Sequence, residues 1–294
     1  MKRRIAFIIN PISGTIKKKQ LPELIQKELD KELFDAEIVF TEYRGHGTDL
    51  ARKFVEEGYD VVTAVGGDGT VNEIAKALVH TNTTLAIIPV GSGNGLARHL
   101  GLPMQVHKAV QALNHSESIR IDYGKVNGKP FFCTCGTGFD AYVSMEFAKG
   151  QNRGVIKYVE KMITGYFSYK PQNCHLVGDG IDLKSKAFVM TFANAAQWGN
   201  NAYIAPQASV QDGKMDISIM SNFPVIAIPS IALQLFTKTI DKDFFVSTLR
   251  AREVTLYRDE EGPFHYDGEP FQEGKEIKVE VIPDGLLVFV KKRF

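Results

Sequence analysis

The chain has 294 residues, of which 44% are hydrophobic and 23% are charged, as in an ordinary soluble globular protein. Its 35 basic and 34 acidic residues give a formal net charge of +1, which excludes a general nucleic-acid binder because such a protein carries a clear basic excess. The three cysteines, Cys133, Cys135 and Cys174, exclude a regular disulfide framework and favour a reducing cytoplasm.

Two apolar stretches bear on membrane attachment. The first, residues 5–9, follows a basic N-terminus, but Asn10 and Pro11 end it too early for a signal peptide, so it predicts a buried strand. The second, residues 223–236, contains two prolines and is too short to cross a bilayer. We interpret it chiefly as core, with an acyl pocket as the alternative. The sequence thus predicts a soluble protein without a transmembrane segment, which contacts membranes only at its surface.

Up to about residue 125 the sequence alternates between strand and helix patterns. Apolar runs predict strands at residues 5–9, 36–41, 61–65 and 85–89. Apolar residues at helical spacing predict helices at residues 21–33, 49–57, 71–78 and 95–100. Buried strands separated by helices form a parallel sheet covered on both faces, and ligands bind beyond the carboxyl ends of such strands.

After about residue 125 the pattern becomes mainly antiparallel β. Asn127 and Gly128 predict a hairpin turn within residues 124–131. Further strands are expected at residues 186–193, 215–220, 252–257, 276–282 and 286–291, with helices at 142–147, 156–165 and 226–239. We therefore predict an α/β N-terminal domain over residues 1–125 and a mainly antiparallel β-sandwich domain over residues 126–294. The last strand is free to return to the first domain.

Three glycine-rich turns each follow a predicted strand of the first domain. Glycines let a backbone approach a phosphate closely, and a helix that begins after each turn adds positive potential. The hydroxyls of Ser13, Thr70 and Ser92 and the amides of Asn10, Asn72 and Asn94 supply further donors. Three such turns on one sheet edge favour phosphate binding over ordinary connecting turns. They are residues 10–14, 66–70 and 89–95.

The turns match neither a Walker A loop nor a dinucleotide fingerprint. Their pattern, Asn-Pro-x-Ser-Gly, Gly-Gly-Asp-Gly-Thr and Pro-x-Gly-Ser-x-Asn, resembles the diacylglycerol kinase catalytic family, which includes bacterial lipid kinases and sphingosine and ceramide kinases. Segments at residues 122–128, 136–141, 211–216 and 267–269 extend the resemblance over nearly the whole chain. It implies an N-terminal fold like those of NAD kinases and phosphofructokinases, and ATP and Mg²⁺ as cofactors.

The resemblance also assigns roles to matching residues. Asp267 matches the general base that takes the proton from the lipid hydroxyl, with Glu269 beside it. Asp212 matches a metal ligand, and carbonyl groups at Ser209 and Lys214 complete that site, whose oxygen ligands suit Mg²⁺. The candidate ATP-binding residues are Asn10, Pro11, Ser13, Gly14, Thr41, Gly66, Gly67, Asp68, Gly69, Thr70, Asn72, Gly91, Ser92 and Asn94.

The acidic residues can also be interpreted from physical chemistry. Asp68 lies in the phosphate loop, where a second anion is costly without a cation, so we expect it to act in catalysis by binding the Mg²⁺ of Mg-ATP. Capping of the following helix is its alternative role. An exposed turn is the alternative for Asp267 and also for Asp212. Asp122 and Asp140 are candidate substrate-binding residues that line a cleft, or else capping or solvated residues.

One departure from the family pattern concerns the acceptor. Many bacterial diacylglycerol kinases have Asn-Asp-Phe-Ala after the third turn, whereas this chain has Asn94-Gly95-Leu96-Ala97. The acidic residue is missing, and residues 91–94 are closer to sphingosine kinases. The sequence therefore predicts an ATP-dependent lipid kinase of phospholipid or sphingolipid metabolism but leaves the acceptor open among a diacylglycerol, a sphingoid base or ceramide, and a phospholipid headgroup.

Two alternatives remain: a kinase of a soluble acceptor such as NAD, and a lipid- or nucleotide-binding module without catalysis. For the lipid kinase we expect a cytoplasmic protein at the inner face of the membrane. The basic and aromatic residues of 149–169 would suit an anionic membrane, although a solvated helix face is favoured there. An exposed strand in the second domain would allow a homodimer.

Overall fold

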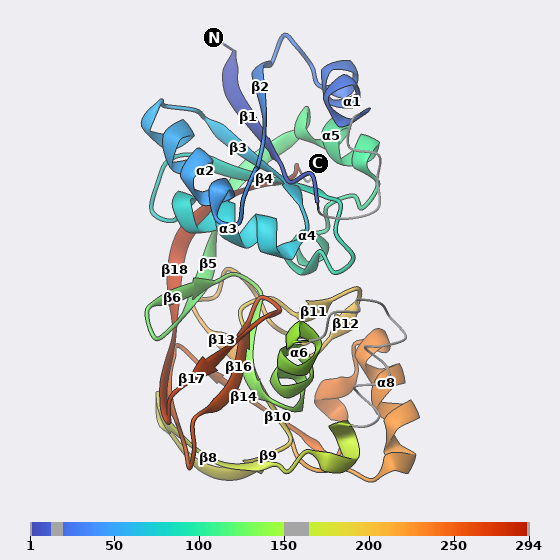
Figure 1. Ribbon diagram of the computed structural model, residues 1–294, viewed down its shortest axis with the longest axis vertical. Coiled ribbons are helices and arrows are strands. Elements are labelled where there is room, and N and C mark those ends of the chain that lie inside the picture. Colours follow the sequence, from blue (N-terminus) through green and yellow to red (C-terminus); the bar gives the residue numbers. More distant parts are fainter. Residues whose placement is uncertain (1, 13–19, 150–164, 293–294) are drawn as a thin grey trace. The chain divides into compact units, whose positions relative to one another are not determined.

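The structure is a computed structural model that describes residues 2–12, 20–149 and 165–292. The chain forms two compact units (Figure 1). Unit 1 joins Met1–Asp122 to Pro283–Phe294, and unit 2 is Tyr123–Ile282. Among the described residues, no helix is both long enough and apolar enough to cross a membrane. The predicted helix at residues 156–165 lies almost entirely outside the described residues.

A parallel sheet forms the centre of unit 1. Its strands lie in the order β2 (Phe34–Phe40), β1 (Arg3–Ile9), β3 (Val61–Gly66) and β4 (Thr84–Pro89). The last part of β18 (Glu276–Lys291) lies parallel beside β4, with Val288 opposite Leu85. Every residue of β3 and β4 is buried, because helices cover both faces of the sheet.

The helices of unit 1 lie on the two faces of this sheet (Figure 1). Because side chains alternate along β1, Ile5, Phe7 and Ile9 all face one side and pack with Leu21 and Ile25 of α1. That side carries α1 (Leu21–Glu28) and α5 (Val106–Leu113), and the other carries α2 (His46–Glu56) and α3 (Asp68–Leu78). The short α4 (Gly95–His99) follows β4.

The first helix is shorter than the predicted residues 21–33. It ends at Glu28, and Leu29 is extended with ψ 133°. The Asp30 carboxylate then accepts a hydrogen bond from the Glu32 amide at 2.8 Å, which stabilises a turn. The apolar spacing continues through Leu33, but the turn chemistry of Asp30 ends the helix.

Unit 2 is built from two mainly antiparallel sheets. The first contains the beginning of β18, β15 (Glu253–Arg258), β8 (Gln172–Gly178) and β9 (Ile181–Ala187), with the end of β5 (Ser116–Val126) and β6 (Lys129–Phe131) also paired. The second has the order β14 (Val246–Ala251), β13 (Met215–Met220), β10 (Val189–Ala193), β7 (Thr134–Gly138), β16 (Gly262–Tyr266) and β17 (Glu269–Glu273). Two short strands, β11 (Gln197–Gly199) and β12 (Ala202–Tyr203), form a separate pair.

The core of unit 2 is formed by side chains of both sheets, as in a β-sandwich. Phe192, Phe264 and Leu256 lie in it, and the free thiols Cys135 and Cys174 pack there as small apolar groups. A second cluster, rich in aromatic residues, contains side chains of α6 (Phe139–Lys149) and α8 (Ile228–Thr237). Two 3₁₀ turns, η2 (Val225–Ala227) and η3 (Ile240–Lys242), flank α8.

The hairpin at Asn127-Gly128 is confirmed, and both residues have the positive φ of a type I′ turn. Three other predictions were wrong in detail. The strand expected at residues 186–193 is the end of β9 followed by β10. The strands expected at 276–282 and 286–291 are one 16-residue strand, β18. Residues 223–236 are mostly not core, since only Phe223 and Ile231 are buried among their large apolar side chains.

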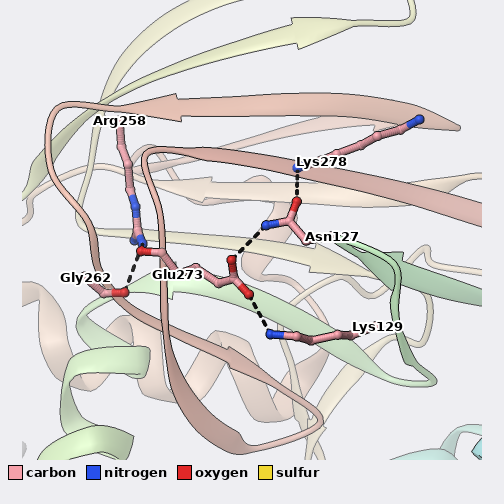
Figure 2. A network of polar contacts seen from close by, with 6 residues as sticks. All are labelled: Asn127, Lys129, Arg258, Gly262, Glu273 and Lys278. Atoms are coloured by element: carbon pink, nitrogen blue, oxygen red, sulfur yellow. Dashed lines mark hydrogen bonds and ion pairs between the residues drawn. The ribbon is translucent and has the colours of Figure 1, made fainter.

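A polar network holds the hairpins of unit 2 together (Figure 2). Glu273 accepts hydrogen bonds from Asn127 at 2.8 Å and Lys129 at 3.0 Å, and Asn127 accepts one from the Lys278 amide. Beside it, the buried Arg258 guanidinium donates to the carbonyl groups of Gly262, Pro263, Gly274 and Glu273 and to the Thr137 hydroxyl. Burial lowers the pKa of Arg258.

Replacing Arg258 with methionine should destabilise the protein by about 2–3 kcal/mol, because buried carbonyl groups would lose their donors. Urea unfolding followed by circular dichroism measures the change. The matched control is Arg252→Met, since Arg252 is exposed and its loss should change stability by less than about 0.5 kcal/mol. Equal stability of the two variants would contradict a structural role for Arg258.

Candidate functional site

The carboxyl edge of the unit 1 sheet brings most of the predicted phosphate residues together. The Asn10 amide donates to the Val65 carbonyl at 3.1 Å, and the Thr41 amide donates to the Ile9 carbonyl at 2.9 Å. The Asn10 side chain also donates to the Thr70 hydroxyl at 3.0 Å. The ends of β1, β2 and β3 therefore meet at one edge of the sheet.

The second and third glycine-rich turns touch each other through their backbones. A Cβ atom added to Gly91 would lie 2.5 Å from the Cα atom of Gly67, which is too close for any real side chain. Gly66 is equally constrained, because its Cβ would lie 2.3 Å from Thr70. These glycines were predicted to admit a phosphate, but packing within the unit already requires them.

Asp68 joins the same two turns. Its carboxylate accepts hydrogen bonds from the amides of Asn94 at 2.8 Å and Gly95 at 2.6 Å. Burial raises the pKa of Asp68, whereas the amides of Gly95 and Asn94 and the charge of Arg98 oppose that rise. The Asp68 carboxylate thus bonds the backbone where α4 begins, in addition to its place at the start of α3.

The side-chain amide of Asn94 closes the third glycine-rich turn by bonding to the backbone of Gly91. Its Oδ1 atom accepts from the Gly91 amide at 3.1 Å and its Nδ2 atom donates to the Gly91 carbonyl at 2.7 Å. Of the other predicted nucleotide residues, Asn72 is buried, whereas Pro11 and Ser92 are exposed. Ser13 and Gly14 lie outside the described residues. Sequence reasoning missed Arg98, whose Nε atom donates to the Gly93 carbonyl at 2.9 Å.

The N-terminus of α3 fits a phosphate. Its first intrahelical hydrogen bond runs from the Val71 amide to the Gly67 carbonyl at 3.0 Å. The backbone amides of Gly69 and Thr70 come before Val71 in the first turn of the helix. Amides in a first turn have no carbonyl partner within the helix, and this end of a helix carries partial positive charge. Asp68 is the one acidic residue among the predicted phosphate ligands, so a Mg²⁺ at this edge would be held mainly by phosphate and water oxygens.

In unit 2, Asp267 occupies the turn between β16 and β17. Asp267 and Gly268 have φ values of 46° and 82°, as a two-residue type I′ hairpin requires. The Asp267 carboxylate accepts hydrogen bonds from the amides of Phe132 at 2.9 Å, Cys133 at 2.7 Å and Thr134 at 3.3 Å. Glu269 begins β17, opposite Tyr266. The carboxylate of Asp267 is therefore fixed to the segment that enters β7.

Asp140 pairs with a histidine that sequence reasoning missed. His265 is buried, and its Nε2 atom lies 2.8 Å from Asp140 Oδ2. Burial, and then the charges of Asp267 and Asp140, raise the pKa of the Cys135 thiol, so these groups lie near one another. No local pattern signals His265, because its partner Asp140 lies 125 residues away in the chain. Asp122 lies in unit 1, where it accepts from the Asp284 amide at 2.9 Å.

The predicted metal residues lie in the loop before β13. The Asp212 carboxylate accepts from the Lys214 amide at 3.1 Å and forms an ion pair with Arg250. The Ser209 hydroxyl accepts from the Gln211 amide at 3.2 Å. Burial raises the pKa of the neighbouring Asp216 to about 6, and Arg250 opposes that rise. In the described part of the chain, no three His, Cys, Asp or Glu side chains are grouped as metal ligands.

Comparison with known protein families assigns both units. The diacylglycerol kinase catalytic domain matches residues 4–126, and the YegS C-terminal NAD kinase beta sandwich-like domain matches residues 133–290. The chain belongs to the diacylglycerol kinase catalytic family. The resemblance inferred from the glycine-rich turns is therefore confirmed.

Curated relatives from two bacteria are similar along most of their length. The probable lipid kinase YegS-like of Yersinia enterocolitica is 28% identical over 248 residues, which are 80% of this chain and 82% of the relative. The probable lipid kinase YegS-like of Pectobacterium atrosepticum is also 28% identical, over 79% of this chain and 80% of the relative.

Solved structures confirm the predicted fold class. A putative diacylglycerol kinase from Bacillus anthracis superposes with a TM-score of 0.77 at 21% identity, over 97% of this chain and 94% of that one. An NAD kinase from Archaeoglobus fulgidus in complex with ATP gives a TM-score of 0.52 at 14% identity, over 98% and 94% of the two chains. The likeness to NAD kinases supports the fold alone.

Proposed function

We propose that this chain is a lipid kinase that transfers the γ-phosphoryl group of Mg-ATP to a lipid hydroxyl. The observation that carries the proposal is the contact between the Gly67 and Gly91 turns. Asp68, at the N-terminus of α3, joins these turns through hydrogen bonds to the amides of Asn94 and Gly95. This contact forms a backbone-lined edge suited to phosphate in a chain of this kinase family.

In the proposed reaction the lipid hydroxyl oxygen attacks the γ-phosphorus, the bond from that phosphorus to the β,γ-bridging oxygen breaks, and ADP leaves. Asp267 accepts the hydroxyl proton. Glu269, two residues further along the chain, is the second acidic residue proposed for catalysis. The amides of Gly69 and Thr70 face the phosphates, with Asn10 and Thr41 at the same edge. Bound Mg²⁺ would neutralise phosphate charge next to Asp68.

The remaining predicted residues keep their roles as proposals. Asp122 and Asp140 are proposed to act in substrate binding, and Ser209, Asp212 and Lys214 to hold a second Mg²⁺. For that second site, Mg²⁺ would have to share the Asp212 carboxylate with Arg250 or displace its guanidinium. The chain would act at the membrane surface that contains the acceptor.

The proposal is tested by incubating the purified protein with γ-labelled ATP and Mg²⁺. One sample contains a total lipid extract, the other contains NAD, and mass spectrometry identifies the labelled product. Label in a lipid supports the proposal and names the acceptor. Label in NADP alone would replace it with a soluble acceptor, and ATP binding without any labelled product would indicate a binding module.

A further inference from the structure

Unit 2 exposes large apolar side chains on and around α8. Ile226 is 88% exposed, Leu233 63%, Phe236 57% and Phe244 93%. Large apolar residues exposed singly are normal on a protein surface, but a group of them marks a site of interaction. We name the group the α8 apolar surface: Val225, Ile226, Ile228, Leu233, Phe236 and Phe244.

Buried and hydrogen-bonded neighbours hold this surface in place. Ile231 is buried and anchors α8, whereas Leu233 and Phe236, three residues apart, share the outer side of the helix. Gln234 donates to Asp243 at 2.6 Å, which fastens the segment before Phe244 to the helix. Phe244 also packs edge-on against Phe245 with ring centroids 5.4 Å apart.

The polar side chains of α8 make hydrogen bonds within the molecule. Gln234 donates to Ser230 at 3.1 Å as well as to Asp243, and the Thr237 hydroxyl donates to the Leu233 carbonyl at 3.0 Å. A protein partner is normally bound with about one hydrogen bond per 100–200 Å². A helix whose polar groups are already bonded internally suits a hydrocarbon environment, which offers none.

The charged side chains that follow α8 differ in exposure. No Asp, Glu, Lys or Arg occurs from residue 217 to residue 237. Directly after it, Lys238 and Lys242 are exposed, whereas Asp241 and Asp243 are partly buried and accept hydrogen bonds from Gln207 and Gln234. An apolar centre with exposed lysines at its edge is complementary to a bilayer that contains anionic headgroups.

We propose that the α8 apolar surface docks on an anionic phospholipid bilayer, with Ile226, Phe236 and Phe244 inserted among the acyl chains. Lys238 and Lys242 then lie at the level of the headgroups. The inference rests in part on the proposed function, since a lipid acceptor has to be reached in its bilayer. Most of residues 149–169, whose basic and aromatic side chains were the other candidate for membrane contact, lie outside the described residues.

Co-sedimentation with extruded vesicles tests the proposal without ATP or turnover. One set of vesicles contains phosphatidylcholine and phosphatidylglycerol, the other phosphatidylcholine alone. Ile226→Ser, Phe236→Ser and Phe244→Ser should each weaken binding roughly tenfold, because each removes inserted apolar area. Leu33→Ser is the matched control, since Leu33 is 40% exposed in unit 1 and its loss should leave binding unchanged.

Two lysine variants test the contribution of charge to vesicle binding. Lys238→Gln and Lys242→Gln should each weaken binding to the anionic vesicles about fivefold and leave binding to the neutral vesicles unchanged. Melting temperatures within about 2 °C of the wild type would show that the exposed substitutions leave the fold intact. Vesicle binding equal to that of the wild type in all three serine variants would overturn the proposal.

Two further readouts separate the alternatives. If light scattering shows that the serine variants convert a dimer into a monomer while vesicle binding persists, the surface is an interface between copies and the proposal fails. Phosphorylation of a short-chain lipid acceptor, monomeric in water, measures the kinase reaction alone. The two proposals can fail separately. If the wild-type chain phosphorylates no lipid but the serine variants still lose vesicle binding, the docking proposal stands and the lipid kinase proposal fails.

Discussion

Asp267→Asn is expected to lower turnover about a thousandfold while ATP affinity stays within about threefold of the wild type. An asparagine cannot accept the proton of the acceptor hydroxyl, whereas the proposed ATP residues of unit 1 are untouched. Initial rates with labelled ATP give the first quantity, and titration calorimetry with ATP gives the second. Turnover close to that of the wild type would show that Asp267 only shapes its turn.

The structural cost of this change needs its own control. An asparagine at 267 would point an NH₂ group at backbone amides of residues 132–134, at a cost of about 1–3 kcal/mol. Asp179 offers a match, because Asp179-Gly180 has φ values of 48° and 78° and the Asp179 carboxylate accepts from the Arg252 amide at 2.8 Å. Asp179→Asn should weaken the single hydrogen bond that supports its turn and keep full turnover.

Gly91→Ala is expected to weaken ATP binding roughly a hundredfold, because the new Cβ atom would displace one glycine-rich turn from the other. The contact at risk is between two backbones, with 2.5 Å from the added atom to the Gly67 Cα, so no side chain can rotate to relieve it. Titration calorimetry with Mg-ATP measures the loss.

The control for Gly91 is a glycine with room for a side chain. Gly274 has no atom within 4 Å of an added Cβ, so Gly274→Ala should bind ATP normally. Unchanged ATP affinity in a folded Gly91→Ala protein would place the nucleotide phosphates away from this pair of turns. A thermal melt of both variants ensures that affinity is compared between folded molecules.

Local sequence was sufficient where a single strand or turn determines the structure. The strands β1, β3 and β4 were predictable because their apolar runs are buried on both faces, and Asn127-Gly128 predicted its hairpin through the φ values that it adopts. The gathering of three glycine-rich turns followed from parallel topology. In each case a general rule connects residues close together in the chain.

The features that sequence reasoning missed depend on residues far apart in the chain. Asp68 is bonded by amides 26 and 27 residues later, and Asp140 by His265 at a separation of 125 residues. No local pattern contains such pairs. The prediction that residues 223–236 are core was wrong for another reason. An uncharged helix is normally buried, but its sequence does not say whether protein or another apolar phase covers it.

The return of β18 to unit 1 has a consequence for biosynthesis. The His80 amide donates to the Gly285 carbonyl at 2.8 Å and the Lys292 amide to the His115 carbonyl at 3.2 Å, so residues 283–292 complete a unit whose other part lies before residue 123. Until they leave the ribosome, β4 has an unpaired edge for Val288 to cover, and open strand edges invite association with other chains. Unit 1 thus becomes complete only after residues 283–292 have been synthesised.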